Sequence, residues 1–112
     1  MAVRMDKSWT PLSVGEVGKL AAHLGVYQLA KDDGEIVFIG MAGGRTLFGL
    51  KGELQKALEE PPLGATQFRV EVNMAYRTRH MELLQAYLND FGGLPAANTD
   101  IDASKIGRLR PG

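Results

Sequence analysis

The sequence of 112 residues contains no cysteine and only two histidines, His23 and His80. The missing cysteines exclude disulfides, thiolate nucleophiles and cysteine-ligated zinc sites. Two histidines cannot build a histidine-rich metal site, and no signature of a serine–histidine–aspartate triad accompanies them. His80 and Glu82 match the histidine-x-glutamate of zinc deaminases, but the cysteine pair of those enzymes is absent. These classes of enzyme are therefore excluded.

The chain also lacks net charge, long apolar runs and phosphate-binding glycine loops. Thirteen lysines and arginines balance thirteen acidic residues, whereas most stand-alone nucleic-acid binders carry a clear basic excess. Neither a dinucleotide-binding loop nor a P-loop is present. No segment approaches the roughly 20 apolar residues of a membrane helix, and no signal peptide is recognisable. We therefore expect a cytoplasmic protein with no membrane partner.

Apolar periodicity and chain breakers predict one α+β domain. The expected elements, in chain order, are a helix over 14–23 capped by Ser13, strands over 25–31 and 35–42 joined by an Asp-Asp-Gly turn, a helix over 47–59, a strand alternating from Phe68 to Met74, and a helix over 77–91. We expect a small three-stranded, mainly antiparallel sheet flanked by helices. Residues 1–12 are an N-terminal lead-in, 13–98 the domain and 99–112 a C-terminal tail.

Two tripeptides, Gly25-Val26-Tyr27 and Phe38-Ile39-Gly40, lie on the two strands of the predicted hairpin, with ten residues between them. A hairpin brings Tyr27 and Phe38 close together. Glu82 follows in the last predicted helix, and Asn98 follows a Leu-Pro pair. From Gly25 to Asn98, this order resembles the GIY-YIG nucleases, in which the two tripeptides lie on adjacent strands beside a metal-dependent phosphodiesterase site.

The resemblance implies roles for particular residues. Glu82 would hold Mg²⁺ or Mn²⁺, because such cations prefer carboxylate oxygens and keep several waters. Tyr27 would position or deprotonate the attacking water, and Lys51 or Arg45 would stabilise the phosphate. Asn98 would orient the site through hydrogen bonds.

The resemblance also implies a shape and a nucleic-acid contact. Tyr27, Phe38 and Glu82 should converge on one concave surface. Arg77 and Arg79 would contact the nucleic-acid backbone.

Three positions depart from the family pattern. Phe38 stands where tyrosine is usual, Lys51 stands at the position of the arginine, and Gln55 replaces a histidine or tyrosine. Lysine lacks the planar fork with which arginine binds phosphate. Two functions therefore stay open. The first is a GIY-YIG-like endonuclease, or a degenerate descendant that binds nucleic acid. The alternative is a non-catalytic protein-interaction module on the same scaffold.

Overall fold

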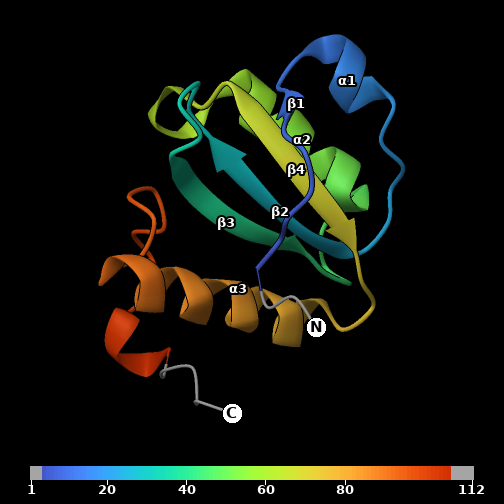
Figure 1. The fold of residues 1–112 in the computed structure, drawn as a ribbon. Helices are drawn as coiled ribbons and strands as arrows, with labels where there is room; N and C mark the ends of the chain where they lie inside the picture. The colour runs from blue at the N-terminus through green and yellow to red at the C-terminus, as the bar shows by residue number, and fades with distance from the viewer. Residues whose placement is uncertain (1–3, 107–112) are drawn as a thin grey trace.

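The computed structural model describes residues 4–106 and shows an α+β domain, as the sequence predicts (Figure 1). Its antiparallel sheet has the strand order β1-β4-β2-β3. The strands are β1 (Thr10–Pro11), β2 (Gly25–Ala30), β3 (Ile36–Ala42) and β4 (Gln67–Val72), and the helices are α1 (Val14–Gly18), α2 (Gly49–Glu59) and α3 (Tyr76–Phe91). Short 3₁₀ turns lie at Pro62–Gly64 and Ala103–Lys105. Among residues 4–106, no helix has the length and apolar character needed to cross a membrane.

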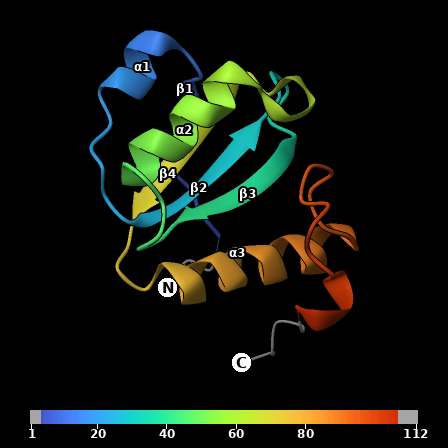
Figure 2. The same cartoon turned by 180° about the vertical axis from the view of Figure 1, so that it is seen from behind.

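The helices cover opposite faces of the sheet (Figures 1 and 2). Successive side chains of a strand point to opposite faces, so neighbouring residues of β2 enter different cores. Tyr27 packs in a cluster with Leu50 and Leu54 of α2. Val26 packs instead with Leu83 and Leu84 of α3. The sheet therefore separates an α2 side from an α3 side.

The segments before and after the predicted domain pack onto it. Thr10 and Pro11 pair with Phe68 and Gln67 of β4, which adds a fourth strand to the expected three. Met5 and Ile106 are both buried in the cluster on the α3 side. Parts of the lead-in and of the tail thus belong to the folded unit; residues 1–3 and 107–112 of those segments lie outside the described residues.

The expected helix boundaries need correction at two places. Ser13 caps α1 as predicted, since its Oγ accepts a hydrogen bond from the Glu16 amide at 3.3 Å, but the helix ends at Gly18 rather than at residue 23. Its two glycines in five residues weaken helix propagation. Helix α2 begins at Gly49 rather than residue 47, and the Thr46 hydroxyl before it accepts a hydrogen bond from the Gly43 amide.

Three apolar residues within the predicted helix ranges, namely Leu47, Met81 and Phe91, are exposed. Leu47 precedes α2 and is exposed, because the helix that should have turned it inward starts two residues later. Phe91 is 69% exposed at the last residue of α3, and Met81 of the same helix is also exposed. The inner face of α3 is formed instead by Leu83, Leu84 and Ala86, among others.

Candidate functional site

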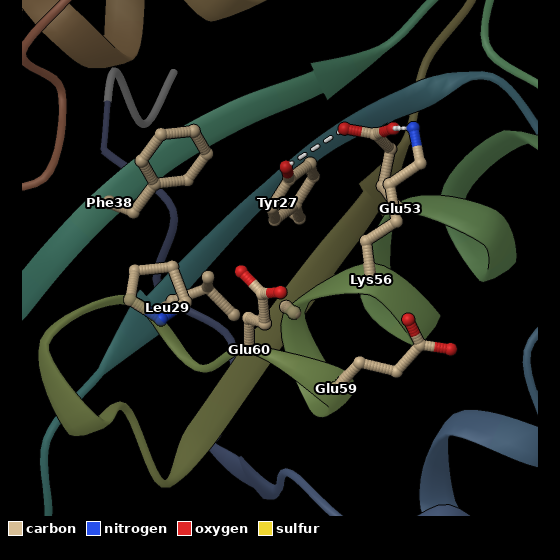
Figure 3. A pocket seen from close by; sticks show the side chains of 9 residues that line it. Tyr27, Leu29, Phe38, Glu53, Lys56, Glu59 and Glu60 are labelled. Carbon is tan, nitrogen blue, oxygen red and sulfur yellow. Dashed lines mark hydrogen bonds and ion pairs between the residues drawn. The ribbon is translucent and has the colours of Figure 1, made fainter.

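An open pocket of about 450 Å³ lies on the α2 side of the β2–β3 hairpin (Figure 3). Tyr27, Leu29 and Phe38 come from the two strands. The carboxyl-terminal half of α2 and the residues after it supply the rest of the lining, namely Glu53, Lys56, Ala57, Glu59, Glu60 and Pro62. We call this the Tyr27 pocket. It combines an aromatic and aliphatic floor with a charged rim.

Gly40 allows the Tyr27 ring to lie flat across β3. The two residues are cross-strand partners, and a Cβ atom at position 40 would lie 2.4 Å from Tyr27 Cζ and 2.7 Å from Phe38 Cε2. The ring centroids of Tyr27 and Phe38 are 5.9 Å apart, so the predicted closeness of these two residues is confirmed. The glycine of the second tripeptide thus makes room for the tyrosine of the first.

The Tyr27 hydroxyl donates a hydrogen bond to Glu53 Oε1 at 3.1 Å. The other oxygen of Glu53 accepts from Lys56 Nζ at 3.3 Å. Burial raises the pKa of Tyr27 far above its ordinary value, and the negative charge and hydrogen bond of Glu53 add to this effect. A phenol in this environment keeps its proton at neutral pH. Tyr27 is therefore arranged as a hydrogen-bond donor, which does not suit the deprotonation of a water.

Replacing Tyr27 by phenylalanine is expected to lower the free energy of unfolding by about 1 kcal/mol, the typical net contribution of one hydrogen bond. Glu53 keeps its ion pair with Lys56 in this variant, so no carboxylate is left without a partner. Urea denaturation measures the loss. Tyr87→Phe is the matched control, because the Tyr87 hydroxyl makes only a 3.4 Å bond to the Ile36 carbonyl, and its loss should be smaller. Equal losses would contradict the importance of the Glu53 contact.

Glu82 lies on α3, on the opposite side of the sheet. Its Oε1 accepts from Arg79 Nη1 at 3.4 Å, and Arg79 also donates to both oxygens of Glu71, at 2.8 and 3.2 Å. Glu71 is the cross-strand partner of Val26, which places this cluster on the α3 side. The expected convergence of Tyr27 and Glu82 on one surface is therefore wrong, because α3 packs on the other face.

Arg79 is 8% exposed and its guanidinium is held between two carboxylates, so it is not placed as a contact for nucleic acid. Burial alone would raise the pKa of Glu71, but hydrogen bonds from Arg79 and Asn73 outweigh burial and hold that pKa below its usual range. The cluster is an ion-pair network centred on Arg79. Across residues 4–106, no group of three or more histidines and carboxylates is placed to hold a metal ion.

Asn98 is buried and fixes the edge of the sheet. Its Oδ1 accepts from the Ile39 amide at 2.9 Å, and its Nδ2 donates to the Ile39 carbonyl at 2.9 Å. Both ends of the side-chain amide are therefore used on strand β3. Asn98 orients that strand and does not line the Tyr27 pocket.

The remaining cations expected at the site do not line the Tyr27 pocket. Lys51 Nζ donates to the Gly18 carbonyl at 3.3 Å, at the end of α1. Arg45 is exposed in the segment between β3 and α2. Arg77 is exposed on α3, with its guanidinium 6.0 Å from the centroid of the Tyr76 ring. Of the predicted residues, the structure brings Tyr27 and Phe38 together on the α2 side, and Arg79 and Glu82 together on the α3 side.

Glu53 and Glu60 line the pocket but are not predicted from the sequence. A signal for Glu53 exists, because Leu50, Leu54 and Ala57 form the buried stripe of α2 and Glu53 lies beside that stripe. A carboxylate at the border of a buried helix face is well placed to meet a polar group of the sheet below. Glu60 follows the last helical residue, before two prolines, and no local pattern marks it.

A family model described as "Domain of unknown function (DUF7508)" matches residues 3–90. No curated protein and no solved structure matches the chain significantly. The family match begins in the N-terminal segment that contains β1 and includes all four strands and most of α3. The chain therefore belongs to the DUF7508 family, a domain family of unknown function.

Proposed function

We propose that this domain is a non-catalytic protein-interaction module whose recognition surface is the Tyr27 pocket. The observation that supports it most is the separation of the two groups that a GIY-YIG-like nuclease would need. Tyr27 belongs to the cluster on the α2 side, and Glu82 lies on the helix that packs against the other face.

Phosphodiester cleavage needs the metal and the attacking water at the same phosphate. Reacting atoms must approach to about 3–3.5 Å, and the metal must contact the oxygen on which charge develops. Here the Tyr27 hydroxyl is bonded to Glu53 and the Glu82 carboxylate to Arg79, with the sheet between the two pairs. One phosphate cannot contact both.

The charge of the Tyr27 pocket also favours a protein partner over nucleic acid. Three glutamates and one lysine line it, so the pocket is acidic. Nucleic-acid binding depends on cations that neutralise the phosphates. The glutamates of an acidic pocket repel those phosphates instead. Aromatic and aliphatic side chains with a few polar groups are typical of sites that bind side chains or small ligands.

The proposal predicts no nuclease activity. Supercoiled plasmid incubated with the protein and Mg²⁺ or Mn²⁺ should show no nicking beyond a protein-free reaction, and Glu82→Gln should leave that background unchanged. Gel electrophoresis over a range of protein concentrations measures this. Glu35→Gln, an exposed carboxylate in the hairpin turn, is a matched control for the purity of each preparation. Metal-dependent nicking that Glu82→Gln removes and Glu35→Gln keeps would overturn the proposed function.

A further inference from the structure

We infer that the Tyr27 pocket binds an arginine side chain presented by a basic segment of a partner protein, an inference that rests on the proposed function. Three features of the pocket support it: carboxylates without partners, the carboxyl-terminal end of α2, and a flat aromatic surface.

Two of the three glutamates in the pocket are uncompensated. Glu53 is occupied by the Tyr27 hydroxyl and by Lys56. Glu59 and Glu60 are exposed, and within residues 4–106 neither side-chain carboxylate accepts a hydrogen bond or forms an ion pair. Since Lys56 is already paired with Glu53, the pocket keeps two negative charges available for a cation.

The end of α2 strengthens this preference. The helix ends at Glu59, and Glu60 is its C-cap residue. The last turn of a helix carries the negative end of its dipole, which favours a cation at that position. Lys56, the basic residue of that last turn, is directed to Glu53. The negative end of the helix dipole is therefore available to attract a cation from a partner.

The shape of the pocket favours arginine over lysine. Phe38, Leu29 and Pro62 supply the apolar lining of the same pocket that Glu60 lines. In Figure 3, Glu60 is turned toward Tyr27, whereas Glu59 extends away from the rings. A guanidinium is planar and weakly hydrated, so it stacks on an aromatic face while it donates two hydrogen bonds to one carboxylate. The compact, strongly hydrated ammonium of lysine gains less from such a lining.

The test is a titration of ¹⁵N-labelled protein followed by NMR. The probes are three blocked tripeptides, acetyl-Gly-Arg-Gly-amide and its versions with lysine or citrulline in place of arginine. The arginine peptide should produce saturable shifts at the amides of Phe38 and Glu60. A single exposed ion pair with stacking predicts a Kd on the order of millimolar. Lysine should bind about threefold to tenfold more weakly. Citrulline, which has the shape of arginine without its charge, should produce no saturable shift.

Variants connect the binding to the pocket. Glu60→Gln removes an exposed charge without touching the core, and it should weaken the arginine peptide by about threefold to tenfold. Phe38→Leu should also weaken it, and its spectrum reports whether the domain stays folded. Glu16→Gln is the matched control, since Glu16 is a half-buried glutamate of α1 that does not line the Tyr27 pocket, and it should change the Kd by less than about twofold.

The outcomes separate this inference from the proposed function. Equal binding of the arginine and citrulline peptides, or of the wild type and Glu60→Gln, would overturn it. Equal binding of arginine and lysine would overturn the assignment to arginine. No binding of any peptide, together with no nuclease activity, would overturn the inference and leave the interaction module standing. Glu82-dependent cleavage would overturn the module whatever the peptides do.

Discussion

Replacing Gly25 by alanine should lower the free energy of unfolding by about 3 kcal/mol or more, since overpacking against main-chain atoms is among the costliest of small substitutions. A Cβ atom at residue 25 would lie 2.1 Å from the carbonyl oxygen of Glu71 and 3.1 Å from Leu50 Cδ1. The Glu71 oxygen belongs to β4, which pairs directly with β2 along the centre of the sheet. A flexible side chain could move aside, but this oxygen moves only if the two strands separate.

Urea denaturation followed by circular dichroism measures the effect of Gly25→Ala. Gly15→Ala is the matched control, because a Cβ atom at this helical position meets nothing within 4 Å. The control should gain about 0.5–1 kcal/mol from the lower chain entropy of the unfolded state. If Gly25→Ala lowers the free energy of unfolding by less than about 1 kcal/mol, the strands shift easily. The approach of the Glu71 carbonyl oxygen would then not explain the glycine at this position.

Local sequence patterns predict much of this fold. The turn residues and the apolar runs on either side locate the hairpin, and the two strands bring Tyr27 and Phe38 together as expected. The serine cap of α1 is also found, and Phe68 of β4 is buried as expected, but β4 ends at Val72, and Val72 and Met74 are exposed. These features depend on residues close together in the chain, so a pattern of a few residues is enough to reveal them.

The side of the sheet on which each helix packs is not encoded locally. The sequence places Glu82 on a helix after β4, but nothing nearby in the chain says whether that helix crosses toward Tyr27 or toward Val26. The same limit applies to Arg79, which reads as part of a basic surface and is in fact buried against Glu71. The strand β1 has two residues, too few to show any periodicity. Such features depend on tertiary contacts. The predicted nuclease site depended on one such feature, the side of the sheet on which α3 packs.

Replacing Asn98 by alanine should lower the free energy of unfolding by about 2–3 kcal/mol, because a buried amide of the edge strand loses its partner. Asn98 is 5% exposed and supplies both an acceptor and a donor to Ile39. His80 Nε2 lies 3.1 Å from the Ile39 carbonyl oxygen and can still satisfy it. The group left unsatisfied is therefore the Ile39 N–H, and its hydrogen exchange should become faster in Asn98→Ala.

Two further variants distinguish a structural asparagine from one that orients a ligand. Asn98→Asp keeps an acceptor for the Ile39 amide but buries a carboxylate oxygen against the Ile39 carbonyl oxygen, so its stability should be below that of the wild type and should improve relative to the wild type at low pH, where the carboxyl is protonated and can donate. Asn89→Ala, at an exposed position of α3, should change stability by less than about 0.5 kcal/mol. Unchanged exchange at Ile39 in Asn98→Ala would show that water or another group replaces the side chain. Slower exchange of the Ile39 amide, together with unchanged stability, would also contradict the structure. β3 is an edge strand, and Asn98 is the side chain that bonds to both backbone groups of Ile39, so its loss should expose that amide.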